Sequence, residues 1–161
     1  MIQLTEKQIA EFHHRCYAAV DGLWFMKVEQ EYGFDSALEI DNEVWKVMPK
    51  IQARMLKSMM KMENGIEALC ACFTTKLALD GFRFKTEKAE DGSAFRVIIS
   101  NCPWYDLMVK SNREHFSEKV GTRICNTEYS VWASEFGDNL HCELQEQLCK
   151  GSECCIIKFS S

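Results

Sequence analysis

The sequence predicts an α+β fold, with N-terminal helices packed on an antiparallel sheet of two hairpins and a long helix between the hairpins. Apolar residues recur at steps of three and four through residues 1–80, which is the period of a helix. They alternate with polar residues in two later segments, 82–99 and 140–159, which is the period of a strand. With 161 residues, the chain is long enough for one core. We therefore expect a single domain, 1–161, with the cysteine site in its second half, 81–161.

The first helix is expected from about Thr5 to Glu31. Thr5 is a suitable N-cap, and Gln8 three residues later completes a capping-box pattern. Gly33 is a natural end for this helix. Its apolar stripe consists of Ile9, Phe12, Cys16, Val20, Leu23 and Trp24.

A second helical segment begins near Asp35 and contains Pro49. The apolar pattern continues through the proline, which predicts either a kinked helix or two abutting helices. A third helix is expected from Asn64 to Leu79, where Asp80 and Gly81 end it.

The first hairpin is predicted around the turn 90–93, and a helical stretch should follow from Tyr105 to Phe136 with a break near Gly121. The second hairpin has its turn at 150–153. By strand parity, Cys142 lies on the same face as neighbouring leucines, whereas His141, Glu143 and Cys149 lie on the other face. On the return strand, Cys155, Ile157 and Phe159 point one way, and Cys154 and Ile156 point the other.

Charge and composition exclude several classes of partner. A net charge of −5 argues against nucleic acid or an anionic membrane, and no apolar run approaches the roughly 20 residues of a membrane span. The N-terminus lacks the features of a signal peptide, so we expect a cytoplasmic protein. The sequence contains no phosphate-binding glycine loop, no serine-hydrolase elbow and no zinc-protease motif. Binding of a small-molecule ligand is still compatible with the sequence.

Nine cysteines are the strongest indication of function, because thiolates are the ligands preferred by zinc and iron–sulfur centres. Six of them lie at or after residue 102. Four come from separate predicted elements, namely a loop, a helix and the two arms of a hairpin, and are the candidate metal ligands: Cys102, Cys125, Cys149 and Cys155. Possible additional ligands are Cys154, Cys142 and His141. The helical phase assigns the remaining three, Cys16, Cys70 and Cys72, to packing.

The spacing of the candidate ligands favours an iron–sulfur cluster over zinc. No CxxC motif occurs in the chain, whereas structural zinc sites usually use two closely spaced pairs. An iron–sulfur cluster, most simply of the 4Fe–4S type, tolerates dispersed ligands better. A catalytic thiol is a third possibility, because Cys125 has a basic neighbour at Arg123 and Cys149 has one at Lys150.

Three blocks in fixed order carry a resemblance to known families. They are residues 22–34 with Ala37-Leu38 and Val44-Trp45; Cys102-Pro103-Trp104 with Gly121-x-x-Ile124-Cys125 and Trp132; and Leu148-Cys149-x-Gly151-x-x-x-Cys155. From about residue 10 to 159, the chain resembles L-2-amino-thiazoline-4-carboxylic acid hydrolase-like proteins, a family of cytosolic prokaryotic proteins. The last block also resembles the C-terminal end of 4-vinyl reductase domains, in which a Gly-x-x-x-Cys hairpin closes an α+β fold.

The resemblance implies that Cys102, Cys125, Cys149 and Cys155 are the family cysteines, and that Cys142 and Cys154 are peculiar to this chain. Ile157 stands where the family often has phenylalanine, which keeps the position apolar.

Three functions follow as hypotheses. The first is a cysteine-ligated metal centre with a redox, sensing or Lewis-acid role. The second is a hydrolase that opens a thiazoline-type ring at a C–N or C–S bond. The third is a non-catalytic ligand-binding or dimerisation module; we also expect a homodimer.

Overall fold

The computed structural model describes residues 3–161 and divides into two compact units, Met1–Asp41 and Asn42–Ser161. Helix α1 (Glu6–Tyr32) makes up most of the first unit, and α2 (Phe34–Trp45) spans the boundary. The predicted capping box is confirmed, since the Gln8 N–H donates to Thr5 Oγ1 at 3.3 Å and the Thr5 N–H donates to Gln8 Oε1 at 2.9 Å. Gly33 ends α1 at a φ of 84°.

The expectation that Cys16 is a packing residue of α1 is wrong. Cys16 is exposed, and α1 has no buried residue among those described. An apolar stripe predicts which face of a helix is suited to burial, but it does not show what buries that face. Within residues 3–161, no helix is long and apolar enough to cross a membrane.

Pro49 marks the start of a new helix, as one of the two predicted alternatives required. Helix α2 ends at Trp45, and α3 (Met48–Met60) begins with Pro49 in its first turn. Backbone N–H groups in the first turn of a helix have no intrahelical acceptor, so proline, which lacks an N–H, is tolerated there. Helix α4 (Ile66–Leu79) follows and ends at Asp80, close to the predicted boundary.

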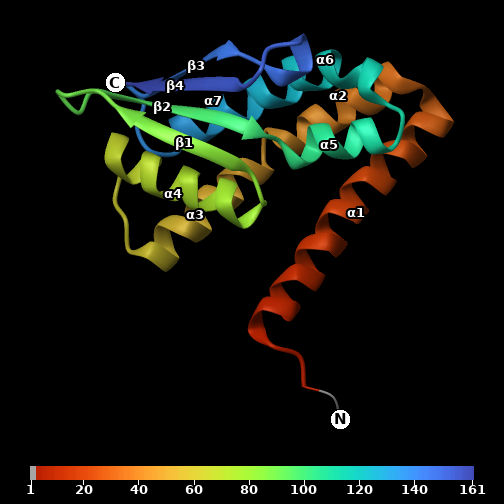
Figure 1. The fold of residues 1–161 in the computed structure, drawn as a ribbon, viewed down its shortest axis with the longest axis horizontal. Coiled ribbons are helices and arrows are strands. Elements are labelled where there is room, and N and C mark those ends of the chain that lie inside the picture. Colours follow the sequence, from red (N-terminus) through yellow and green to blue (C-terminus); the bar gives the residue numbers. More distant parts are fainter. Residues whose placement is uncertain (1–2) are drawn as a thin grey trace. The chain divides into compact units, whose positions relative to one another are not determined.

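The second unit contains a four-stranded antiparallel sheet, which confirms the predicted α+β class (Figure 1). Its strands are β1 (Arg83–Lys88), β2 (Ala94–Asn101), β3 (His141–Glu146) and β4 (Cys155–Ser160). The order in the sheet is β1-β2-β4-β3, so the two hairpins join through β2 and β4.

One face of the sheet forms the core against α4 and α7 (Asn126–Ser134), and α3 packs on both of these helices. Phe73 of α4 is fully buried at the centre, with its ring 5.5 Å from that of Trp132 on α7 and 5.0 Å from that of Phe159 on β4. Buried strand residues alternate as the period of two predicts: Phe95, Val97, Ile99, Ile157 and Phe159. Cys70 and Cys72 are buried in α4, and Cys142 packs against this core, as expected.

The helical stretch between the hairpins breaks earlier than predicted. Helix α5 (Pro103–Lys110) ends before Asn112, whose φ of 57° is left-handed. A short 3-10 helix (Glu114–Phe116) and α6 (Ser117–Val120) follow. At Gly121, where a break was expected, the chain instead continues through a π-helical turn (Gly121–Cys125) directly into α7.

The parity prediction for Cys149 in the second hairpin is wrong. The register of β3 shifts between Leu144 and Glu146, and the chain then leaves the strand for a 3-10 turn (Leu148–Lys150). Gly151 has a φ of 86°, and β4 begins only at Cys155, so Cys154 lies outside the strand. A bulge adds one residue to one strand, and it therefore cancels any parity argument that crosses it.

A buried ion pair joins α4 to α7. The Lys76 ammonium contacts the Glu128 carboxylate and lies 3.2 Å from Asp80 Oδ2. The side chains of Lys76 and Glu128 are only 4% and 8% exposed. Burial by itself lowers the pKa of Lys76, but the charges of Glu128 and Asp80 outweigh burial and raise it. Lys76 is therefore a permanent cation inside the second unit.

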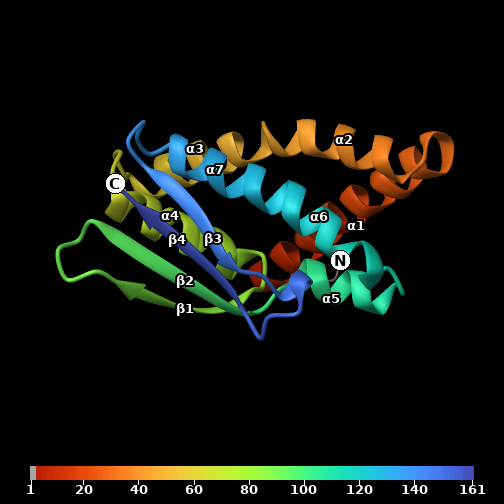
Figure 2. The ribbon, with the colours of Figure 1, turned by 90° about the horizontal axis from the view of Figure 1, so that it is seen from above.

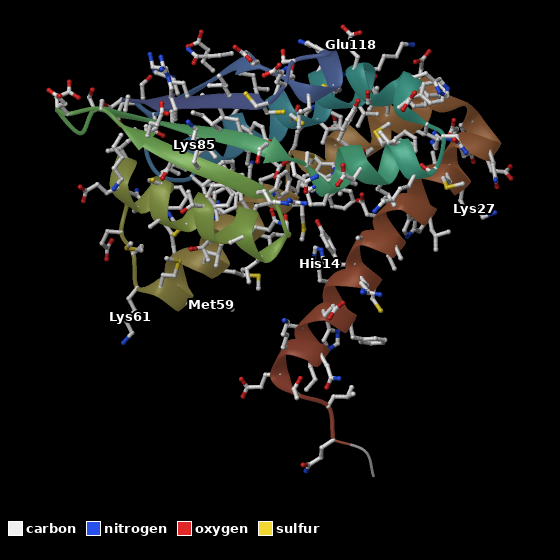
Figure 3. All side chains as sticks on the ribbon, in the orientation of Figure 1. His14, Lys27, Met59, Lys61, Lys85 and Glu118 are labelled. Atoms are coloured by element: carbon white, nitrogen blue, oxygen red, sulfur yellow. The ribbon has the colours of Figure 1, made fainter. Side chains whose placement is uncertain are left out.

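Lys76→Met should destabilise the protein strongly, because it leaves buried carboxylates without their cation. Removal of one partner from a buried pair costs about 3–5 kcal/mol, and we expect that loss in the free energy of unfolding from urea titration. Lys85→Met is the control (Figure 3): Lys85 is 68% exposed and pairs with Glu87 at 3.3 Å. Its effect should stay within about 0.5 kcal/mol. Equal losses in the two variants would contradict a structural role for the buried pair.

Candidate functional site

Four elements bring the candidate ligands to one end of the sheet. Cys102 follows β2 and stands at the N-cap of α5, and Cys125 is the last residue of the π-helical turn. Cys149 lies in the 3-10 turn, and Cys155 is the first residue of β4. Cys155 pairs with Ile99 across the sheet, three residues before Cys102. Figure 2 shows that the end of β2, the β3–β4 connection and α6 lie at this same end.

Cys125 interacts electrostatically with the other three candidate ligands. Burial of its thiol raises its pKa well above the usual value, and Glu128 adds to the rise. The negative charges that Cys102, Cys155 and Cys149 would carry as thiolates raise it further. All three other candidates therefore lie close enough to Cys125 for their charges to interact with it. We call Cys102, Cys125, Cys149 and Cys155 the thiol group.

Burial also keeps the other members of the thiol group protonated. It raises the pKa of Cys102 to about 11 and that of Cys155 to about 11. The pKa of Cys149 is raised as well, chiefly by burial, while the nearby Lys150 opposes the rise. Without a bound cation, these side chains are neutral thiols at pH 7.

A backbone N–H donates to the sulfur of Cys155, and two others affect the pKa of Cys102. The Leu148 N–H donates to Cys155 Sγ at 3.2 Å. At the start of α5, the N–H groups of Tyr105 and Trp104 act to lower the pKa of Cys102, against the larger effect of burial. Such donors stabilise the thiolate relative to the thiol. The backbone therefore favours negative charge on sulfur at a place where burial opposes it.

Gly121 leaves the space that Cys149 fills. A Cβ atom at position 121 would lie 2.5 Å from Cys149 Sγ and 3.4 Å from its Cβ. Buried Gln147 fixes the same approach, because its Nε2 donates to the Gly121 carbonyl oxygen at 3.2 Å. The 3-10 turn and the π-helical turn are thus held against each other. π-Helical turns are rare and occur frequently at functional sites.

Sequence reasoning missed several neighbours of the thiol group. Glu128 and Tyr129 come three and four residues after Cys125, so they share its face of the helix. This spacing could have predicted both residues as neighbours of Cys125. Burial raises the pKa of Tyr129 well above its usual value, and the charge of Cys125 adds to the rise. Gln147 gave no comparable signal, because its contact with Gly121 spans 26 residues.

The three additional candidates lie away from the thiol group or at its margin. His141 pairs with Ser160 and Cys142 with Phe159, near the end of β4 opposite to Cys155. Five residues of strand correspond to about 17 Å. Cys154 lies just outside β4, with its Sγ 3.9 Å from Glu146 Oε2. Residues 3–161 contain no group of three or more His, Cys, Asp or Glu side chains that is arranged to hold a metal ion.

The fold and the site define an α+β protein whose thiols from four elements gather at one end of its sheet. The chain belongs to a family of unknown function, DUF6125, whose model matches residues 4–152. That match includes Cys102, Cys125 and Cys149, whereas Cys155 lies three residues beyond it. A search of curated proteins found no match to this chain.

Gly121→Ala should displace Cys149, because the new methyl group and the sulfur cannot occupy the same space. Overpacking of this kind costs about 1–3 kcal/mol, and we expect that loss of stability in urea titration. Gly22→Ala is the matched control, since a Cβ atom there meets nothing within 4 Å. Inside a helix this second change should be neutral or stabilising by up to about 1 kcal/mol. Two variants of equal stability would argue against the close approach at Gly121.

Alkylation of the native, metal-free protein by iodoacetamide should follow burial and pKa. At pH 8, a thiol of pKa about 11 such as Cys102 is only about 0.1% thiolate, the reactive form. Because its pKa is raised, its labelling rate should increase about tenfold per pH unit as the pH rises towards that value. Exposed Cys16 should label first, and Cys125, which is half-buried and whose pKa is raised well above the usual value, should label last, as read by peptide mass spectrometry. Labelling of Cys125 before Cys16 would contradict this order.

Proposed function

We propose that the thiol group binds an iron–sulfur cluster, most simply of the 4Fe–4S type, and that the protein acts in electron transfer or redox sensing. Zinc is the alternative ion. The observation that carries the proposal is geometric: Cys155 pairs with Ile99 close to Cys102 at one end of the sheet, and Cys149 lies against Gly121, four residues before Cys125. Free cysteine is an ordinary core residue, but four thiols from separate elements at one end of the sheet offer the number of ligands that a cluster needs.

The raised pKa values imply that metal binding would be coupled to the release of protons. Each thiolate would raise the pKa of its neighbours, so ionisation of the whole group without a metal is unfavourable. A coordinated metal deprotonates its thiol ligands outright and reverses this penalty. Binding and ionisation are therefore coupled: the protons leave as the metal enters, and affinity should rise with pH.

The surroundings of the sulfurs are suited to a redox centre. Hydrogen bonds to the sulfurs, burial and nearby charge set the potential of iron–sulfur clusters. The Leu148 N–H supplies one such bond, and the charges of Glu128 and Lys76 act in opposite senses on the pKa of Cys102, which burial raises. Four cysteine ligands fill the protein-facing positions of a cluster. That arrangement favours electron transfer or sensing over Lewis-acid chemistry, which needs an open position.

A hydrolase that uses a cysteine nucleophile is less well supported. Nucleophilic cysteines have lowered pKa values, whereas the Cys102 and Cys155 values are raised to about 11 and the Cys125 value is raised further. The opening of a thiazoline-type ring therefore stays a prediction drawn from family resemblance.

All nine cysteines are free thiols, which suits a reducing compartment, and we infer a cytoplasmic location.

Anaerobic purification with iron, sulfide and zinc analysis tests the proposal. The wild-type protein should contain iron and acid-labile sulfide, or should take them up on anaerobic reconstitution, and should show a brown chromophore that dithionite bleaches. Serine substitution of any member of the thiol group should remove at least half of the bound iron while the protein stays folded. Stoichiometric zinc with no sulfide would select the alternative ion.

Two cysteine variants serve as controls for the same measurement. Cys16→Ser removes an exposed thiol from α1, and Cys142→Ser removes a partly buried thiol near the opposite end of β4. Each should retain wild-type iron content. A folded wild-type protein that holds no metal after reconstitution, with all four thiols open to titration, would overturn the proposed function.

A further inference from the structure

Helix α1 carries a continuous apolar seam that is exposed along its whole length. The seam side chains follow one another at steps of 3, 4, 3, 4 and 3 residues: Ile9, Phe12, Cys16, Ala19, Leu23 and Met26. Every one of them is exposed, with Phe12 at 60% and Leu23 at 58%. Val20, which borders the seam, is 55% exposed. Large apolar side chains gathered in this way mark an interaction surface.

The alternation of three and four identifies the kind of partner. It averages 3.5 residues, which is the repeat that keeps two supercoiled helices in contact along one stripe. In heptad terms, Ile9, Cys16 and Leu23 occupy a positions, while Phe12, Ala19 and Met26 occupy d positions. A seam of this repeat fits another helix of the same repeat, and α1 itself has that property.

We propose that α1 pairs with α1 of a second copy of this chain as an antiparallel coiled coil. In that arrangement, a residues of one helix face d residues of the other. One register aligns the whole seam: Ile9 faces Met26, Phe12 faces Leu23, and Cys16 faces Ala19, each pair occurring twice by symmetry. Large residues then meet large residues at the ends, and the two small pairs at the centre let the backbones approach closely.

Charge complementarity selects this orientation. In an antiparallel pair, e positions face e positions, and this register places Glu6 of each copy opposite Lys27 of the other. The side chain of Lys27 projects from α1 (Figure 3) and donates to Gln30 at 2.9 Å, an exposed contact that is easily exchanged. A parallel pair would instead place Gln8 opposite His13, Arg15 opposite Val20, and Gly22 opposite Lys27, so no opposite charges would meet.

The size of the seam predicts the strength of the dimer. At 27 residues, α1 is about 40 Å long. Twelve core side chains from two copies place the contact near the lower end of stable interfaces, about 1,200 Å² in total. We therefore expect a reversible dimer whose population depends on protein concentration.

Sedimentation velocity of the full chain over a range of concentrations tests the proposal. The wild-type protein should pass from monomer to dimer, and Leu23→Ala should raise the dissociation constant by about 100-fold. Because α1 has no buried residue among those described, this variant should keep its fold, as checked by circular dichroism. A wild-type protein that is monomeric at every concentration would overturn the proposal.

A charge-swap series tests the orientation. Glu6→Lys and Lys27→Glu each place like charges opposite one another twice, so each should raise the dissociation constant by about tenfold at low salt. The double variant restores opposite charges and should return to the wild-type value. Lys7→Glu, on the outer face of α1, is the control and should have little effect. A double variant weaker than either single variant would overturn the antiparallel register.

Oxidative cross-linking provides a second readout of orientation. Cys16 faces Ala19 in the antiparallel register, so Ala19→Cys should form disulfides between subunits that join the introduced thiol to Cys16, identified by peptide mass spectrometry. In the wild-type protein the two copies of Cys16 are offset by three residues, about 4.5 Å along the axis, so a link between them should form more slowly. A wild-type link between the two copies of Cys16 that forms faster than the link in Ala19→Cys would instead indicate a parallel pair, and would overturn the proposal.

Discussion

The buried contact between Lys76 and Glu128 is the constraint on which the second unit depends. It joins two helices whose contacting residues are 52 positions apart, and it does so where water cannot replace either partner. Glu128 lies one helical turn after Cys125, and Tyr129 in the same turn packs its ring 5.5 Å from that of Phe73. The ion pair therefore fixes both the rotation and the depth of α7, and with them the position of the Cys125 sulfur. A hydrophobic replacement for this pair could hold the helices together, but it would remove both charges that act on the pKa of Cys102, the raising effect of Glu128 and the smaller lowering effect of Lys76.

Close approach explains how the thiol group forms without any short cysteine motif. The 3-10 turn that carries Cys149 rests on the π-helical turn because Gly121 has no side chain and Gln147 holds the Gly121 carbonyl. Antiparallel pairing brings the start of β4 beside the end of β2, which places Cys155 and Cys102 at one end of the sheet. Separate local rules, namely a sheet register, a helix start, a π-helical turn and a tight approach at one glycine, thus converge on one set of sulfurs.

The sequence predicted the fold class and part of the site because both rest on local periodicity. Alternation located all four strands, and the capping box located the start of α1. Parity failed for Cys149, since a register shift and a 3-10 turn between Leu144 and Gly151 erase the period on which parity rests. Amphipathicity predicted an apolar stripe on α1, yet Cys16 in that stripe is exposed and no residue of the helix is buried among those described. The pairing of Lys76 with Glu128 leaves no local pattern at all, because each residue alone looks like an ordinary charge on a helix.

The π-helical turn makes the site depend on the number of residues between α6 and α7. From Gly121 to Cys125, the backbone uses one residue more than an α-helix would use to cover the same advance. Loss of a single residue there would restore the α-helical path over the same advance and would change which side chains of the turn face inward. Thr122 and Arg123 are exposed, so other side chains fit at both positions. The number of residues in this turn, more than their identity, decides whether Gly121 and Cys125 both face the place where the sulfurs gather.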